Sequence, residues 1–389
     1  MGSKSPARHA GYNPLAMITP VLGSLSAPQF IRRYWQKRPL FIRGAVPDIR
    51  DRFSAEQMRR LAYREDVESR LVTHTGGKWD LVHGPFTRHR LKQPGARHWS
   101  LLVQGVDTQL DSARKLLDRF NFVPYARLDD VMLSLAPPGG GVGPHFDSYD
   151  VFLLQVHGTR RWRIGAQDDL TLIDAPLRIL KRFVPQQEFV VEPGDVLYLP
   201  PQIAHDGVAL TECITCSIGF RAPERQELAE AFLQWLPDAL HLEGRYADPG
   251  LKPSRHPASI DASMVRQVGK MLAGVRWNES LVASFLGEYL TEPKPNVWFA
   301  PPDEALDIDQ FKRHAKGIGI RLHRKTRMLY RDDHVFINGQ SLKVPKSVQH
   351  EVRQLADARS LEGITTRLSW WTSTLHDWYC AGYVELEQR

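Results

Sequence analysis

Two histidines and one aspartate form the pattern in this sequence that is best suited to chemistry. His145 and Asp147 are two residues apart and follow a glycine-rich run that starts at Gly139, and His205 comes sixty residues after His145. Residues two apart on a strand share a face, so the side chains of the first pair can reach one ion. Two imidazoles and one carboxylate that leave further positions open suit a non-haem Fe(II) centre that activates oxygen. The spacing therefore predicts a metal site made by His145, Asp147 and His205.

A dicarboxylate co-substrate of such a centre needs a cation, and arginine is the residue suited to two-pronged carboxylate binding. Strand alternation places Arg160 with Trp162 and Ile164, on the face that we expect to point inward. Arg160 is therefore the candidate for binding 2-oxoglutarate, and a structural salt bridge is the alternative. Hydroxyls that could add neutral hydrogen bonds, or could be ordinary strand residues, lie in the same part of the chain: Ser134, Thr215 and Ser217.

The elements that must position these residues are short strands. Between residues 128 and 220, short apolar or alternating runs are separated by Gly/Pro clusters, a pattern typical of a β-sandwich or barrel. A loose arm is expected over 1–25, and helices are expected within 28–43, 54–63 and 107–121. From residue 223 helical patterns dominate, within 225–241, 262–274 and 277–290. Beyond a proline-rich connection, helices near 304–316 and 346–357 flank a hairpin of strands 319–330 and 334–345.

These patterns predict three domains. They are a catalytic domain over 1–222, a helical region over 223–300 and a winged-helix-like module over 301–389. Hydrophobic residues make up 42% of the 389 residues, which is ample for packed cores and argues against wholesale disorder. The three cysteines make no disulfide framework, and neither a signal peptide nor a long apolar span is visible. We therefore expect a cytoplasmic protein without a membrane segment.

Four segments resemble the bacterial cupin-4 or JmjC-type ribosomal oxygenases. They are FIRRYWQKRPLFIRGA (30–45), GGGVGPHFDSYDVF (139–152), RRWRIG (160–165) and LPPQIAHDGVAL (199–210). The resemblance implies a mixed α+β chain with a double-stranded β-helix (cupin/JmjC) core, a helical dimerisation region and a C-terminal winged-helix-like domain. It also implies Fe(II) bound by His145, Asp147 and His205, with 2-oxoglutarate held by Arg160, Ser134 and Thr215, and with O2 as the oxidant.

The family's activity is implied in the same way. Its bacterial members hydroxylate the β-carbon of an arginine in the sixteenth protein of the large ribosomal subunit and form homodimers, and human relatives hydroxylate histidine. An arginine substrate needs an acidic or aromatic receptor, for which Tyr149 and Asp150 are candidates; the alternative is that they shape the strand.

Two other functions stay open at this stage. One is an oxygenase that acts on a different protein residue (His or Lys), on tRNA or on a small molecule. The other is a non-catalytic dimeric cupin that serves as a binding module, against which the intact set of His145, Asp147, His205 and Arg160 argues. The net charge of +7 does not demand a nucleic-acid partner. For the basic C-terminal module we expect a solvated face rather than nucleic-acid binding.

Overall fold

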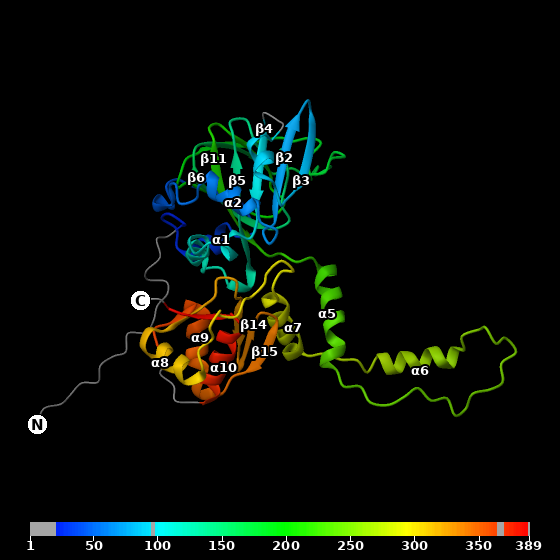
Figure 1. Ribbon diagram of the computed structural model, residues 1–389. Coiled ribbons are helices and arrows are strands. Elements are labelled where there is room, and N and C mark those ends of the chain that lie inside the picture. The colour runs from blue at the N-terminus through cyan, green and yellow to red at the C-terminus, as the bar shows by residue number, and fades with distance from the viewer. Residues whose placement is uncertain (1–20, 95–97, 364–368, 388–389) are drawn as a thin grey trace, which may run out of the picture. The chain divides into compact units, whose positions relative to one another are not determined.

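Figure 1 shows a computed structural model of the chain, which describes residues 21–94, 98–363 and 369–387. Most of the expected N-terminal arm lies outside the described residues. The chain forms two compact units. Unit 1 contains Met1–Ala222, Pro293–Thr326 and Arg353–Arg389, and unit 2 contains Pro223–Glu292 and Arg327–Val352. None of the described helices is both long and apolar enough to cross a membrane.

An eight-stranded antiparallel sheet forms the centre of unit 1, as the short strands predicted. Its order is β1-β9-β6-β11-β5-β4-β2-β3. The strands are β1 (Leu40–Ile42), β2 (Ser69–Thr75), β3 (Lys78–His83), β4 (His98–Val103), β5 (Leu128–Ala136), β6 (Asp150–His157), β9 (Val196–Leu199) and β11 (Cys213–Phe220).

A smaller sheet of order β10-β7-β8 covers one face of the large one, with β7 (Arg160–Gly165), β8 (Gln187–Val191) and β10 (Ala204–Ala209). Trp162 and Ile164 of β7 pack in one cluster with Val151 and Leu153 of β6. The inward face predicted from Trp162 and Ile164 is therefore confirmed. The two packed sheets enclose the space in which the predicted site residues lie.

Helices and an aromatic cluster cover the other face of the large sheet. Phe152 of β6 lies in this cluster with Phe30, Phe120 and Tyr198, all fully buried. Ser26 begins the first helix with a reciprocal capping box with Gln29. The elements here are α1 (Ala27–Arg33), η2 (Pro47–Ile49), α2 (Ala55–Ala62), α3 (Arg88–Lys92), η3 (Val106–Thr108), α4 (Asp111–Leu117), η4 (Asp118–Phe120) and η5 (Tyr125–Arg127).

The C-terminal part of unit 1 contains a three-stranded sheet of order β16-β12-β17 with helices beside it. Phe311 of the first helix is fully buried against Tyr379 of the last. The elements are α8 (Ile308–Ile318), β12 (Ile320–Leu322), β16 (Ser360–Leu361), α10 (Ser369–Cys380) and β17 (Val384–Leu386). Before β16 in the sequence come η6 (Lys346–Val348), which belongs to unit 2, and α9 (Gln349–Ala358), which starts in unit 2 and ends in unit 1.

Unit 2 contains α5 (Arg225–Ala239), α6 (Ala262–Leu272) and α7 (Glu279–Thr291). Their bounds agree to within two residues with the three helices predicted after residue 223. It also holds the sheet of β13 (Met328–Arg331), β14 (His334–Ile337) and β15 (Gln340–Lys343). The predicted single strand over 319–330 is wrong. A turn closed by the bond from Thr326 N to His323 O separates β12 from β13, and these strands belong to different sheets.

Candidate functional site

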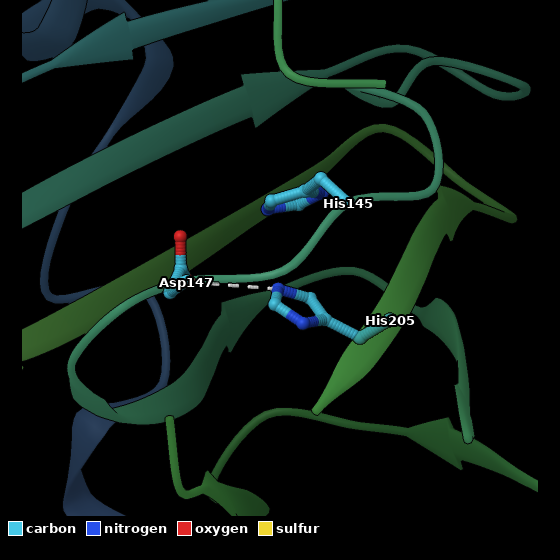
Figure 2. Close-up of side chains that lie close together, drawn as sticks. All are labelled: His145, Asp147 and His205. Carbon is cyan, nitrogen blue, oxygen red and sulfur yellow. Dashed lines mark ion pairs between the residues drawn. The ribbon is translucent and has the colours of Figure 1, made fainter. Parts of the chain in front are cut away.

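The two histidines and the aspartate come together at one point between the two sheets of unit 1. One ligand-type atom from each of His145, Asp147 and His205 lies within 4.8 Å of the others. Figure 2 shows the three side chains converging, with Asp147 Oδ2 3.6 Å from His205 Nε2. The imidazole centroids are 4.2 Å apart. Two nitrogens and one carboxylate at this separation can bind a single divalent ion.

Hydrogen bonds to backbone carbonyls fix the orientation and the tautomer of both imidazoles. His145 Nδ1 bonds to the carbonyl of Gly143 and His205 Nδ1 to that of Ile203, both at 2.9 Å. A carbonyl only accepts, so each Nδ1 carries the proton and each Nε2 keeps a lone pair. Burial, with His145 nearby, lowers the pKa of His205 to about 4, so this imidazole is neutral at physiological pH. Neutral imidazole is the form that binds a metal.

The metal motif is extended but is not part of a regular strand, unlike the sequence interpretation. His145 forms an isolated bridge with His205 through two backbone hydrogen bonds of 2.9 and 2.8 Å, and β6 begins only at Asp150. The preceding Gly143 has a φ of +79°, and a Cβ there would lie 2.7 Å from the Trp79 ring. The glycine-rich run thus lets the chain turn against β3 before the bridge fixes both histidines.

A cavity of about 470 Å³ contains the three residues together with Ser134, Thr215 and Arg160. Arg160 is 4% exposed, and its Nη1 lies 3.5 Å from Ser134 Oγ. Its Nε and Nη2 are buried and have no hydrogen-bond partner among the described residues. Unpaired buried donors cost free energy, so this guanidinium is suited to receive a carboxylate. The alternative of a structural salt bridge for Arg160 finds no acidic partner in the described parts of the chain, where its guanidinium contacts Ser134 and the Trp162 ring.

Ser134 and Thr215 are directly opposite each other on β5 and β11, but their hydroxyls differ in direction. Gln155, which the sequence interpretation missed, donates through Nε2 to the carbonyls of His157 and Gly158, so its Oε1 must accept. Thr215 Oγ1 donates to that oxygen at 2.9 Å. Thr215 therefore offers only lone pairs to the cavity, whereas Ser134 accepts from Arg160 and keeps its proton for a ligand.

This difference predicts opposite effects for two conservative variants. We expect Ser134→Ala to weaken 2-oxoglutarate binding about tenfold, because it removes a hydrogen bond to a charged group. Thr215→Val should change that affinity less than about threefold, but should lower the unfolding free energy by about 1–2 kcal/mol by leaving Gln155 Oε1 buried and unpaired. Calorimetric titration of the cobalt-loaded protein, with thermal unfolding in parallel, measures both. Equal losses of affinity would contradict the assignment.

The two residues suggested for substrate contact point to different places. Tyr149 lines the cavity and is half-exposed. Asp150 does not line it: its carboxylate is fully buried on the opposite face and accepts hydrogen bonds from Tyr198 Oη at 2.6 Å and Gln36 Nε2 at 2.9 Å. The substrate interpretation of Asp150 is therefore wrong. Adjacent residues at the start of a strand face opposite ways, and Asp150 faces the aromatic cluster with Phe152.

Two acidic residues that the sequence interpretation missed also line the cavity, Asp129 and Asp130. They occupy a β-bulge: Leu128 pairs with Phe220 and Val131 with Ile218, so both aspartates lie opposite the single residue Gly219. Strand alternation would send consecutive side chains to opposite faces, and the bulge changes their direction. Asp130 and Ser134 are four residues apart on β5, about 13 Å for an extended strand. The acidic pair and the Arg160 region therefore lie at different ends of the cavity.

Basic residues of the C-terminal module are partly engaged within unit 1. Arg321 pairs with Glu385 at 2.7 Å, and Arg324 pairs with Asp111 at 3.4 Å. The exposed cations of α8 are Lys312, Arg313 and Lys316.

Comparison with known proteins places this arrangement in a family. Residues 115–228 match the JmjC domain family and residues 274–385 the ROXA-like winged helix. The chain is 34% identical, over 83% of its length and 87% of the relative, to the ribosomal protein uL16 3-hydroxylase of Escherichia coli. It belongs to the JmjC ribosomal oxygenase family. A probable ribosomal oxygenase of Haemophilus influenzae is 30% identical over 86% of both chains.

A solved structure of this family contains both a metal and 2-oxoglutarate, the co-substrate predicted from the sequence. YcfD, a ribosomal oxygenase from Escherichia coli in complex with cobalt and 2-oxoglutarate, has a TM-score of 0.80 and 31% identity, with 94% of this chain and 99% of that chain covered. The fold predicted from the resemblance is thus confirmed, as a JmjC core with a helical region and a winged helix. So is the enzyme class: the chain is a metal- and 2-oxoglutarate-dependent oxygenase.

Proposed function

We propose that this ribosomal oxygenase uses Fe(II), 2-oxoglutarate and O2 to hydroxylate the β-carbon of an arginine in the large-subunit ribosomal protein uL16. The observation that carries the proposal is one cavity lined by the His–Asp–His triad, by a buried arginine with two donors that lack partners in the described chain, and by an acidic pair. The similarity to the uL16 3-hydroxylase of Escherichia coli supports the same substrate. A cytoplasmic location follows from a ribosomal substrate and is part of the proposal.

His145, Asp147 and His205 would hold the Fe(II), and Arg160 with Ser134 would bind the far carboxylate of 2-oxoglutarate. When both are bound with O2, they supply the oxidising power: one oxygen atom enters a substrate C–H bond, and 2-oxoglutarate becomes succinate and CO2. The chain itself positions the substrate C–H bond near the metal and excludes water from the cavity. Trp162 and Leu153 form apolar walls of the cavity between the Arg160 region and the metal site.

The acidic pair would receive the substrate guanidinium. Asp129 is partly exposed and Asp130 is 5% exposed, so a side chain that enters the cavity can reach one carboxylate at the rim and one inside. Guanidinium groups bind carboxylates in a forked geometry, and the Tyr149 ring adds an aromatic face beside Gly219. A histidine or a neutral small molecule would gain less from two carboxylates, and a lysine ammonium lacks the forked donor geometry, which favours arginine over these three alternatives.

The proposal is tested by aerobic incubation of the purified protein with Fe(II), 2-oxoglutarate and a uL16 peptide that contains the target arginine. Mass spectrometry should show a gain of one oxygen, about 16 Da, on that arginine, and fragmentation should place it on the β-carbon. His145→Ala is the control without activity. Metal-dependent succinate formation without a modified peptide would keep the oxygenase and reject the arginine substrate.

We also propose three domains: a catalytic domain, 1–222, a helical region, 223–300, and a winged-helix-like domain, 301–389. The helical region would form the interface of a homodimer. In support, α6 has no buried residue and presents an apolar stripe at helical spacing. The exposed residues of the stripe are Met264, Val265, Val268, Met271 and Leu272. A stripe of this kind needs a covering partner, and a second copy offers an identical one.

An aspartate in this stripe should therefore separate the subunits. We expect Val268→Asp to raise the dimer dissociation constant at least about 100-fold, because two carboxylates would be buried without partners. Arg266→Asp places the same residue on the polar face and should leave the dimer intact. Sedimentation equilibrium measures both. A wild-type protein that stays monomeric at micromolar concentration, or a Val268→Asp protein that dimerises normally, would contradict the proposal.

A further inference from the structure

The acidic pair of the cavity already has a cation beside it. Lys294, from the segment that starts at Pro293, places its Nζ 3.1 Å from Asp129 Oδ1 and 3.3 Å from Asp130 Oδ2. One ammonium therefore bridges two carboxylates that are consecutive in sequence. Its side chain is about one-third exposed, whereas that of Asp130 is 7% exposed. Asp129 has a second, more distant cation, because Arg221 Nε lies 3.7 Å from the same Oδ1.

Asp130 is poorly placed to carry a charge without this lysine. The pKa of its carboxyl is raised to about 6, mainly by burial and further by the Asp129 and Asp107 carboxylates. Lys294 and a hydrogen bond from Gln104 lower this pKa and so limit the rise. The charged and titratable groups that face Asp130 come from several elements. They are Lys294, Asp129 on β5, Asp107 in η3, Cys216 on β11 and Tyr149 before β6, and the neutral amide of Gln104, after β4, adds its hydrogen bond.

A guanidinium can bind this pair only where both carboxylates are ionised. With both carboxylates ionised, Lys294 and the more distant Arg221 balance the charge of Asp129 and Asp130, so a guanidinium meets no net repulsion and can bind through forked hydrogen bonds. Each carboxylate has about four lone-pair sites, so the contacts with Lys294 leave acceptors for a forked donor. If Asp130 were protonated, the same cluster would have a net charge of +1 and would repel a guanidinium, and the O–H of Asp130 would point a donor where the guanidinium needs an acceptor.

We propose that Lys294 is a positioning residue for the substrate: it keeps Asp129 and Asp130 together as two ionised carboxylates, so that an incoming guanidinium finds two charged acceptors side by side. The proposal rests on the proposed arginine substrate and adds a determinant of its binding. It assigns Lys294 no contact with the metal site or with 2-oxoglutarate.

The variant that tests this role is Lys294→Met, which removes the charge and keeps an apolar stem. A charge within 4 Å shifts a carboxyl pKa by one to three units, so we expect the acidic limb of kcat/KM for the peptide to move up by about one pH unit. Activity should fall about threefold near pH 6.5 and about tenfold near pH 5, because the ionised fraction of Asp130 falls by these factors when its pKa rises by one unit from about 6. Near pH 8.5 it should equal or exceed that of the wild type, because both carboxylates are then ionised and no ammonium competes for them.

Lys294→Arg should keep the wild-type limb, and Lys312→Met, on the exposed face of α8, should leave the profile unchanged. Lys294→Gln replaces Lys294→Met if the latter fails to fold. The affinity for 2-oxoglutarate and the peptide-independent formation of succinate should be the same in all variants. A merely structural role would lower activity equally at every pH, and such a uniform loss would overturn the proposal.

A second measurement keeps this inference separate from the proposed function. Carboxyl titration by NMR of [13C]aspartate-labelled protein, with Asp130→Asn to assign the signal, reports Asp130 without any peptide. The Asp130 signal should titrate at higher pH in Lys294→Met than in the wild type. If no arginine peptide is hydroxylated but this shift occurs, the arginine substrate fails and the effect of Lys294 on the pair stands. An unchanged Asp130 titration rejects the role of Lys294 whatever the substrate.

Discussion

Replacing His205 with alanine should abolish hydroxylation, with a loss of at least about 100-fold in kcat/KM. Even residues that only orient metal ligands contribute about 10- to 100-fold, so the removal of a ligand should cost more. The buried neutral imidazole of His205 offers its Nε2 lone pair beside Asp147. Alanine would leave one imidazole and one carboxylate, too few to hold a divalent ion firmly. Hydroxylation of the uL16 peptide and calorimetric cobalt binding should fall together.

The matched control is His157→Ala, at the end of β6. His157 is half-exposed and pairs with Asp51 at 2.6 Å, and it does not line the cavity. Its replacement should leave metal binding and turnover unchanged. Thermal unfolding separates ligand loss from misfolding, because the backbone bridge between His145 and His205 does not need the His205 side chain. A His205→Ala protein that binds cobalt and turns over normally would rule out the proposed ligand set.

The sequence allowed the inner face of the core strands to be predicted where alternation holds. Arg160, Trp162 and Ile164 are all buried, whereas Arg161 and Arg163 on the other face are partly exposed. The period of two on a strand is a local rule, so a short segment was enough to predict this placement. The meeting of His145 with His205 depends on a long-range pairing that strand alternation cannot give. It was predicted from the need of the metal for a second imidazole, and the family resemblance implied the same residue.

Local reasoning failed where the backbone departs from regular geometry. The aspartates of β5 enter the cavity because of a bulge opposite Gly219, and a bulge depends on the pairing of two strands distant in sequence. Lys294 reaches the same corner from a connecting segment without strand or helix periodicity. Asp150 is different, because alternation with Phe152 already places it on the face away from the cavity. The sequence therefore held the signal against Asp150, and it was missed.

The second large effect is expected for Arg160→Ala. Arg160 would make two hydrogen bonds to the 2-oxoglutarate carboxylate, each worth about 1.5 kcal/mol or more when both groups are charged. Their loss should weaken 2-oxoglutarate binding on the order of 100-fold. The measurement is calorimetric titration of cobalt-loaded protein with 2-oxoglutarate. Arg161→Ala, one residue further on the partly exposed face, is the control and should bind normally.

The same variant should not destabilise the protein in the absence of 2-oxoglutarate. Arg160 Cζ lies 5.5 Å from the centroid of the Trp162 ring, and Arg160 Nη1 lies 3.5 Å from Ser134 Oγ. Within the described chain, the guanidinium is thus held by weak contacts. Two further buried donors lack partners there, so the side chain costs stability until a ligand arrives. We expect an unchanged or higher melting temperature for ligand-free Arg160→Ala, and no further rise when 2-oxoglutarate is added.

These paired results also distinguish a co-substrate role of Arg160 from a structural one. In a binding module that has no use for a dicarboxylate, Arg160 would be expected to support the fold, and its replacement would lower the melting temperature with or without 2-oxoglutarate. In the oxygenase, a buried cation is kept at a cost because the co-substrate compensates it. A melting temperature that falls in Arg160→Ala while its 2-oxoglutarate affinity stays unchanged would make Arg160 a structural residue and would place the far carboxylate of 2-oxoglutarate elsewhere.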